Sequence, residues 1–412
     1  MSVVVKKTGV AECTKRILKS EKKTKTAANT HKQAQEGKGL LLTNQNTSTI
    51  IFLTAAWRFY AAAVQQVPAF KRGLWQKGKV RFMKKIINKP ENYVDEMLKG
   101  IYAAHGDQVK YTADDLRCYC KANKKPGKVA IITGGGTGHL PLFLGYVGDG
   151  LIDGCGVGGV FQSPTPEQIY NITKEVEAGA GVLYLYGNYT GDIMTFDMAT
   201  DLCDMDDIVC KSIVGADDVN SSADPATRRG VAGIYFMYKA AGAKADEGGS
   251  LNEVLAAAQL AKDNTRTVGF ALTPCIIPEI GHPNFELKED EMAMGMGIHG
   301  EPGVWNGPLK TSREIAEESL KTLLDDMPVA AGEEVCLLIN GLGATSVEEL
   351  YILSNDVTEL LAAKGIKVYQ TKVGEYATSM EMAGASISIC KMNDELKHYV
   401  DYPVNTPFIC QK

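Results

Sequence analysis

The run from Lys128 to Gly138 constrains the fold more than any other part of the chain. Residues 128–133 are rich in β-branched side chains, which predicts a buried strand, and they lead directly into Gly134-Gly135-Gly136-Thr137-Gly138. Glycine adopts backbone conformations closed to other residues and lets the backbone approach a ligand closely. Because apolar residues follow from Pro141, we expect a strand–loop–helix unit whose backbone N–H groups face an anion or a polar ligand.

Short apolar runs alternate with amphipathic stretches from Met83 to the C-terminus. Strands are expected at 128–133, 181–186, 207–214, 267–273, 334–339 and 368–373. Helices are expected at 90–104, 166–178, 195–205, 252–262, 312–326 and from 346 onward. This alternation is typical of an α/β fold with parallel or mixed sheets flanked by helices. The sequence changes character near residue 265, so we expect two α/β domains, at 83–265 and 266–412.

Residues 1–82 differ from the rest of the chain in charge and pattern. They hold 16 of the 44 basic residues and three of the 49 acidic ones, which leaves 28 basic and 46 acidic residues after them. The apolar run at 50–63 is shorter than the roughly 20 residues that a membrane span needs, and it begins too late for a secretory signal. We expect a non-native or disordered extension whose deletion leaves solubility and activity intact. A targeting or anchoring segment and an extra structural element are the alternatives.

Composition narrows the class of protein. An acidic main body gives no support to nucleic-acid binding. The ten cysteines form no CxxC pair and no Cys/His cluster with zinc spacing, which is typical of reduced thiols in a cytoplasmic protein. An acidic cluster is interpreted as a solvated helix end, so no metal site is predicted; it comprises Asp201, Asp204, Asp206 and Asp207.

Three glycine-rich segments carry the residues with chemistry. His139 ends the glycine run, Asp192 ends Gly187-Asn188-Tyr189-Thr190-Gly191-Asp192, and His299 lies in the run 295–303. Imidazole titrates near neutrality and suits proton transfer to or from a hydroxyl. The alternatives are a histidine at a helix start, an aspartate that caps a helix beginning at Thr195, and a histidine in a mobile turn.

A nucleotide-binding oxidoreductase is disfavoured. His139 occupies the third-glycine position of a dinucleotide fingerprint, the acidic residue expected on the ribose is not found, and the loop lacks the Gly-Lys-Ser/Thr of a phosphate-binding loop.

From Met83 onward, the chain resembles the substrate-binding K subunit of the dihydroxyacetone (glycerone) kinase family. The resemblance rests on the opening Met83-Lys84-Lys85-Ile86-Ile87-Asn88, the glycine run, Val160-Phe161-Gln162-Ser163-Pro164, the Asn-Tyr-Thr-Gly-Asp box and the Gly-Ile-His-Gly-Glu-Pro-Gly box, in that order.

The resemblance implies specific roles for the site residues. His299 would add to the ketone carbon of a short ketose and form a covalent hemiaminal. Asp192 would accept or orient the proton of the substrate hydroxyl, with His139 as its catalytic companion. The implied substrate-binding residues are Gly135, Gly136, Thr137, Gly138 and Gly187.

The resemblance also implies partners. This chain would bind no cofactor itself, because Mg²⁺ and ATP or ADP would lie on a separate L subunit that supplies the phosphoryl group. The ultimate donor, ATP or phosphoenolpyruvate through a phosphotransferase-system protein, stays open. A homodimer is implied as well, with no nucleic-acid or membrane partner.

Two positions depart from the pattern of many members. Leu140 replaces an acidic residue after His139, and Gly187 replaces a lysine before Asn188. The main expectation is phosphorylation of dihydroxyacetone to dihydroxyacetone phosphate. These departures keep open another short ketose such as erythrulose. A non-catalytic ketose sensor that acts on a transcription regulator is a further alternative, although the retained Asp192 and His139 favour an enzyme.

Overall fold

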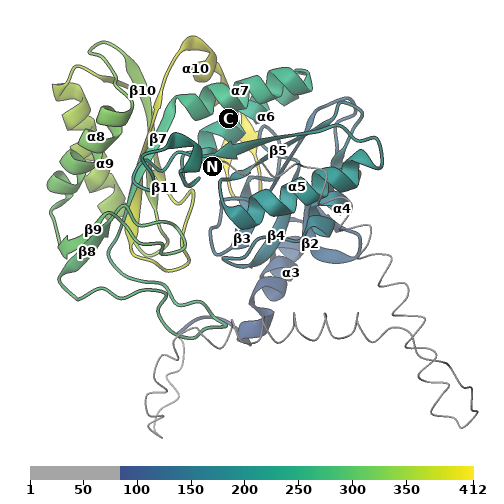
Figure 1. Ribbon diagram of the computed structural model, residues 1–412, viewed down its shortest axis with the longest axis horizontal. Coiled ribbons are helices and arrows are strands. Elements are labelled where there is room, and N and C mark those ends of the chain that lie inside the picture. Colours follow the sequence, from purple (N-terminus) through teal and green to yellow (C-terminus); the bar gives the residue numbers. More distant parts are fainter. Residues whose placement is uncertain (1–83) are drawn as a thin grey trace, which may run out of the picture. The chain divides into compact units, whose positions relative to one another are not determined.

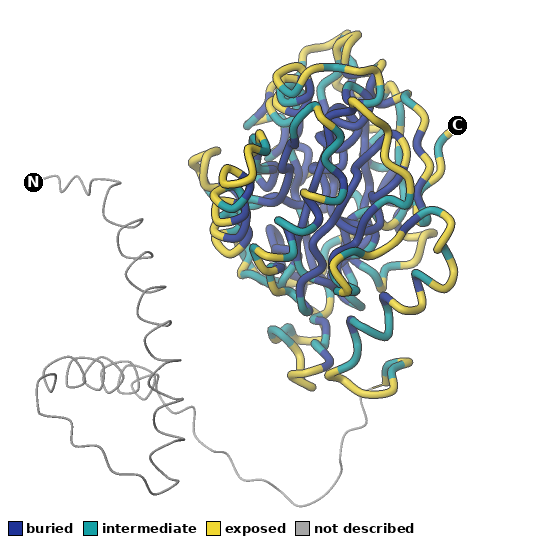
Figure 2. The backbone as a smooth tube through the Cα atoms, turned by 90° about the vertical axis from the view of Figure 1, so that its right-hand side faces the viewer, coloured by how far each residue is buried: buried dark blue, intermediate teal, exposed yellow. Residues whose placement is uncertain are grey.

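The computed structural model describes residues 84–412, which belong to one compact unit. The predictions for residues 1–82 therefore lie outside the described residues. The described chain contains two six-stranded sheets and a small two-stranded sheet near the C-terminus (Figure 1). The central strands of both sheets are buried, and most exposed residues lie on outer helices, edge strands and loops (Figure 2).

The first sheet has the order β1-β2-β4-β3-β5-β6. Its strands are β1 (Val109–Thr112), β2 (Asp115–Lys121), β3 (Ala130–Thr137), β4 (Gly154–Val160), β5 (Val182–Gly187) and β6 (Cys210–Gly215). Strands β3 to β6 run parallel to one another, whereas β2 pairs antiparallel with both β1 and β4. The chain leaves β3 for β4 on one side and later returns to β5 on the other. A change of direction of this kind is where open α/β sheets bind ligands, beyond the carboxyl ends of the strands.

Helices cover both faces of the first sheet. They are α3 (Tyr93–His105), α4 (Pro166–Val176), α5 (Thr190–Asp204), α6 (Ile234–Asp246) and α7 (Leu251–Asp263), with single 3₁₀ turns at η1 (Pro90–Asn92), η2 (Leu144–Tyr146) and η3 (Pro225–Thr227). Successive strand residues point to opposite faces. Thus Ile132 packs in a cluster with α4 and α5, whereas Ile131 packs in the cluster that contains α3, α6 and α7.

The second sheet has the order β11-β10-β12-β7-β8-β9. Its strands are β7 (Thr265–Ala271), β8 (Glu291–Met294), β9 (Trp305–Pro308), β10 (Glu334–Gly341), β11 (Lys367–Gly374) and β12 (Gly384–Lys391). Helices α8 (Ser312–Asp326) and α9 (Val347–Ala363) cover one face through a core that includes Val268, Leu337 and Ile387.

Helix α6 lies between the two sheets (Figure 1). Its residues share one hydrophobic cluster with Ile131 of the first sheet and Leu338 of the second. The helix is buried on all sides, so its sequence lacks the polar face by which an amphipathic helix is recognised. After the second sheet, α10 (Asp394–Asp401) contacts α6. The chain then ends with the pair β13 (Val404–Asn405) and β14 (Cys410–Gln411).

The predicted fold class is confirmed, since both sheets are mixed or largely parallel and flanked by helices. The domain division at residue 265 stays a prediction. The strand–loop–helix unit, by contrast, was wrong in two respects. First, strand β3 continues through the glycines to Thr137 and pairs with β4 at Gly134 and Gly135. Second, the element that follows is a 3₁₀ turn at Leu144–Tyr146 and not an α-helix. Helix α5 begins at Thr190, so Asp192 lies inside its first turn and is not the helix cap.

Among residues 84–412, no helix combines the length and the apolar character needed to cross a membrane.

Candidate active site

The residues singled out from the sequence follow the carboxyl ends of neighbouring parallel strands. His139 comes two residues after β3 ends, Phe161 directly follows β4, and Asp192 lies in the helix turn just after β5. His299 belongs to the other half of the chain, in the loop between β8 and β9. The fold therefore brings the three glycine-rich segments to one edge of the first sheet.

His139 is a buried, neutral imidazole. Its Nδ1 lies 2.8 Å from the carbonyl oxygen of Thr378. A carbonyl only accepts hydrogen bonds, so Nδ1 carries the proton and Nε2 keeps a lone pair. The side chain is completely buried, and Nε2 has no partner. Burial, assisted by the nearby His299, lowers the pKa of His139 to about 3, so this ring offers a hydrogen-bond acceptor to a ligand hydroxyl.

His299 is oriented by Glu301. Its Nδ1 lies 2.8 Å from Glu301 Oε1, and its backbone N–H donates to the other carboxylate oxygen at 2.9 Å. Burial raises the pKa of Glu301, but the hydrogen bond and charge of His299, with the charge of Arg229, outweigh burial and hold it at about 2. With an ionised acceptor at Nδ1, the proton stays on that nitrogen, and Nε2 is left as a nucleophilic lone pair.

Arg229 ties the His299 loop to the first sheet. Its guanidinium lies 2.8 Å from Asp218, which follows β6, and donates to the carbonyl oxygen of Gly295 at 3.0 Å. A third contact reaches Glu301 at 3.8 Å. Arg229 therefore links the carboxylate that orients His299 to a buried aspartate of the first half.

Asp192 is a buried carboxyl with an unused oxygen. It is 4% exposed, and its Oδ1 has no hydrogen-bond partner. Burial raises its pKa to about 6, against the opposing effects of a hydrogen bond from Ser163 and the charge of His299. A carboxyl with such a pKa is largely ionised at neutral pH yet still binds a proton readily, which suits a general base.

Aromatic rings pack the two histidines together. The ring centroids of His139 and His299 are 4.7 Å apart, with the rings nearly perpendicular. Phe161 stacks on His139 at 4.9 Å, and Tyr189 meets His299 edge-on at 4.8 Å. Phe161 has a φ of 57°, which is rare for a bulky residue and is typical of a position held in place for function.

The glycines permit close packing behind the histidines. A Cβ at Gly136 would lie 2.7 Å from the backbone of Phe161, and Gly138 has a φ of 107°. A Cβ at Gly135 would overlap the Phe143 ring, and one at Gly187 would lie 3.0 Å from the Tyr189 ring.

Thr137 lies within the same glycine run. Its hydroxyl donates to the carbonyl oxygen of Gly158 at 2.8 Å. Its only proton is therefore used within the protein, so the hydroxyl can offer a ligand only an acceptor.

The structure brings His139 and His299 into contact and places Asp192 within electrostatic reach of His299, without a hydrogen bond between them. Sequence reasoning missed the roles of Glu301, Arg229 and the Thr378 carbonyl. Glu301 had a signal, because it stands two residues after His299 in the same glycine-rich box. The other two had none, since only the folded chain brings them to the histidines.

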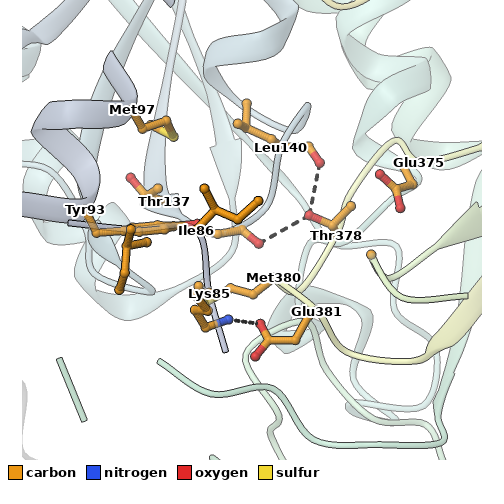
Figure 3. A pocket seen from close by; sticks show the side chains of 13 residues that line it. Lys85, Ile86, Tyr93, Met97, Thr137, Leu140, Glu375, Thr378, Met380 and Glu381 are labelled. Atoms are coloured by element: carbon orange, nitrogen blue, oxygen red, sulfur yellow. Dashed lines mark hydrogen bonds and ion pairs between the residues drawn. The ribbon is translucent and has the colours of Figure 1, made fainter. Parts of the chain in front are cut away.

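A cavity of about 440 Å³ is lined in part by Thr137, Gly138 and Leu140, the chain neighbours of His139. None of the three predicted catalytic residues lines it. Figure 3 shows how Thr378 donates to the carbonyl oxygens of Gly138 and Leu140, while Lys85 pairs with Glu381. The cavity thus borders the backbone that carries His139, and its walls include the contacts that hold this backbone in place. Among residues 84–412, this site included, no group of three or more His, Cys, Asp or Glu side chains is arranged to hold a metal ion.

Comparison with known proteins identifies relatives over most of the chain. The Dak1 domain matches residues 99–408. The dihydroxyacetone-binding subunit of PTS-dependent dihydroxyacetone kinase 1 from Listeria innocua is 44% identical over 76% of this chain and 95% of its own length. L-erythrulose kinase from Pectobacterium atrosepticum is 36% identical over 78% of this chain and 55% of its own length. Among solved structures, the dihydroxyacetone kinase operon co-activator DhaQ has 33% identity and a TM-score of 0.71 over 75% of this chain and 96% of its own.

Proposed function

The chain belongs to the family of Dak1-domain proteins, and from this premise we propose that it is the ketose-binding subunit of a dihydroxyacetone-type (glycerone) kinase. In this reaction a short ketose, dihydroxyacetone, becomes dihydroxyacetone phosphate. The observation that carries the proposal is the hydrogen bond between His299 Nδ1 and ionised Glu301, which leaves a nucleophilic nitrogen beside the buried His139. The Listeria relative, 44% identical and matched over nearly its full length, is named as a dihydroxyacetone-binding subunit, which supports the same function.

Covalent capture of the substrate begins at His299. Its Nε2 lone pair adds to the ketone carbon, the π electrons of the carbonyl move to oxygen, and that oxygen takes up a proton to complete a hemiaminal. The imidazole gains positive character as the bond forms, and the ionised carboxylate of Glu301 stabilises it. Glycerol has similar hydroxyls but no carbonyl carbon, so this step selects ketoses over glycerol.

Phosphoryl transfer then needs a base at the terminal hydroxyl of the captured ketose. Asp192 has a free oxygen and a pKa of about 6, so it accepts this proton as the hydroxyl oxygen attacks phosphorus. The neutral His139 accepts a second substrate hydroxyl at Nε2, which fixes the captured molecule for transfer.

The phosphoryl group comes from a separate nucleotide-bearing L subunit, which holds the Mg²⁺ and the adenine nucleotide. The name of the Listeria relative, a PTS-dependent kinase, supports a phosphotransferase-system donor upstream of that subunit. A second copy of this chain completes a homodimer. All nine cysteines among residues 84–412 are free thiols, which supports a location in the reducing cytoplasm.

The test is a substrate panel with the full chain. Dihydroxyacetone, erythrulose, glyceraldehyde and glycerol are each offered with a nucleotide-loaded L subunit, recharged either by ATP or by a phosphoenolpyruvate-driven phosphotransferase system. We expect turnover of a ketose and none of glycerol, together with a ketose adduct on the intact protein by mass spectrometry. Turnover of glycerol would contradict the capture mechanism. So would turnover of a ketose by the unaltered protein if that protein forms no adduct beyond what His299→Ala forms.

Two observations favour other members of the same family. Erythrulose has one more hydroxylated carbon, and the likeness to an erythrulose kinase, with Gly187 in place of a lysine, favours it as an alternative substrate. The likeness to an operon co-activator favours a ketose sensor. Faster turnover of erythrulose selects the first. A ketose adduct with no turnover of any substrate selects the second.

A further inference from the structure

Two cysteines lie together at the far end of the helix that carries Asp192. Cys203 belongs to the last turn of α5, and Cys210 is the first residue of β6. The buried hydroxyl of Tyr184 lies 3.3 Å from the sulfur of Cys203 and 3.5 Å from that of Cys210. The connecting residues 204–209 are mostly exposed. The two thiols therefore surround one hydroxyl, and only a short surface segment joins them.

The shared contact with the Tyr184 hydroxyl sets the two thiols apart from another close pair. Cys118 and Cys120, two residues apart on β2, direct their thiols to backbone carbonyl oxygens instead. Burial raises the pKa of the Cys118 thiol to about 12 and raises that of Cys120 as well. Both thiols are also completely buried, so a molecule from solvent does not reach the Cys118–Cys120 pair.

The exposure of the two thiols decides the order of events. Cys203 is completely buried, whereas Cys210 is half-buried at the start of an exposed segment. A molecule from solvent reaches Cys210 first, and Cys203 then stands ready behind it. This arrangement matches an attacking thiol with a resolving thiol.

We propose that Cys203 and Cys210 form a modification site, a dithiol that small-molecule disulfides convert reversibly into an intramolecular disulfide. Because α5 also carries Asp192, the bond would fasten the distal end of the helix that positions this carboxylate to β6.

The chemistry balances with a disulfide such as oxidised glutathione. Interaction between the two thiols lowers the pKa of Cys203 to about 7 and raises that of Cys210, so the pair loses one proton near neutral pH. Transfer of the remaining proton from Cys210 to Cys203 places the negative charge on Cys210. With the charge on Cys210, its sulfur attacks glutathione disulfide and releases one glutathione thiolate. That thiolate takes the proton of Cys203. The Cys203 sulfur then attacks Cys210 and displaces the second glutathione thiolate.

The sequence offers a clean readout of this reaction. Trypsin cleaves after Lys174 and Lys211, so one peptide, 175–211, contains Cys203 and Cys210 and no other cysteine. The full chain is incubated with oxidised glutathione, its remaining thiols are alkylated, and the digest is weighed by mass spectrometry. We expect the peptide to lose two hydrogens and take up no alkyl group. Dithiothreitol should restore two alkylatable thiols.

Matched thiols in the same digest control the experiment. The exposed Cys410 should carry glutathione, which proves that the oxidant acted, and the peptide 118–121 should keep both thiols. The Cys203→Ser variant should trap glutathione on Cys210. The proposal fails if Cys410 reacts with glutathione while peptide 175–211 stays fully alkylated. It also fails if this peptide, in the protein without the Cys203→Ser substitution, keeps glutathione and forms no disulfide.

Discussion

Replacing Asp192 by asparagine is expected to stabilise the protein at neutral pH while removing most of its turnover. The carboxyl is 4% exposed. Burial raises its pKa from 3.8 to about 6, against the hydrogen bond from Ser163 and the charge of His299. Keeping this group ionised at pH 7 therefore opposes folding. A shift of roughly two units corresponds to about 3 kcal/mol of folding free energy. The substitution removes that cost and, with it, the base.

The stabilising effect of Asp192→Asn depends on pH. A carboxyl with a raised pKa keeps its proton in the folded state at pH values where the unfolded chain has already released it. The contribution of Asp192 to stability is therefore lost as pH rises from 3.8 to about 6, and the full cost applies above that range. Between pH 5 and pH 7 the calculated change is ~1.3 kcal/mol. Because asparagine does not titrate, its advantage over aspartate should shrink by about this amount at pH 5.

The assay is urea unfolding of the unaltered protein and of Asp192→Asn at both pH values. The matched control is Asp197→Asn, because Asp197 is exposed on the same helix. In parallel, Asp192→Asn should lose roughly 100- to 10,000-fold of its turnover and still form the ketose adduct. An equal stability difference at pH 5 and pH 7, or full turnover of the variant, would refute the reasoning.

Three further predictions test other parts of the site and the core. His299→Ala should form no ketose adduct. Glu301→Gln should weaken capture by about 10- to 100-fold, since a hydrogen bond to a charged group is worth ~1.5–3 kcal/mol. The yield of adduct, measured by mass spectrometry, tests both variants. Gly136→Ala should destabilise the fold by ~1–3 kcal/mol, because the new Cβ would lie 2.7 Å from the backbone of Phe161. By contrast, Gly100→Ala in α3, where a Cβ meets nothing within 4 Å, should be neutral or slightly stabilising in the same urea assay. Burial lowers the pKa of Lys239 to about 7, so stability should rise with pH from about 7 toward the ordinary lysine value of 10.5, and Lys239→Met should abolish that rise.

Elements with a one-sided hydrophobic pattern could be predicted from the sequence. Helix α8 occupies the predicted residues 312–326, because its buried and exposed positions alternate with helical spacing. Helix α6 had no such pattern, since it is buried between two sheets. The strand predicted at 128–133 ended too early for a related reason, because β3 continues to Thr137. Glycine usually signals a turn, but in Gly134–Gly136 the missing side chains make room for Phe143, Phe161 and Phe196 while the backbone stays extended.

The candidate site shows a similar division. His139, Asp192 and His299 could be chosen from their glycine-rich surroundings, because such segments lie at strand ends. The groups that set the tautomer and orientation of these side chains could not be predicted from the sequence, since they come from distant parts of the chain. The carbonyl of Thr378 sets the tautomer of His139, and Arg229 supports the carboxylate that orients His299. A backbone carbonyl carries no mark in a sequence, and an arginine has many other possible partners.

Three titratable groups in this one site have separate pKa values for separate reasons. Burial holds the pKa of His139 at about 3, so the ring is neutral throughout the physiological range. Glu301, paired with His299, has a pKa of about 2 and is ionised throughout it. Of the three, only Asp192 has a pKa of about 6, because it is buried and its Oδ1 has no hydrogen-bond partner. The acidic limb of turnover should therefore include the titration of Asp192, with an apparent pKa near 6. Turnover that does not change between pH 5 and pH 7 would show that Asp192 is not the base.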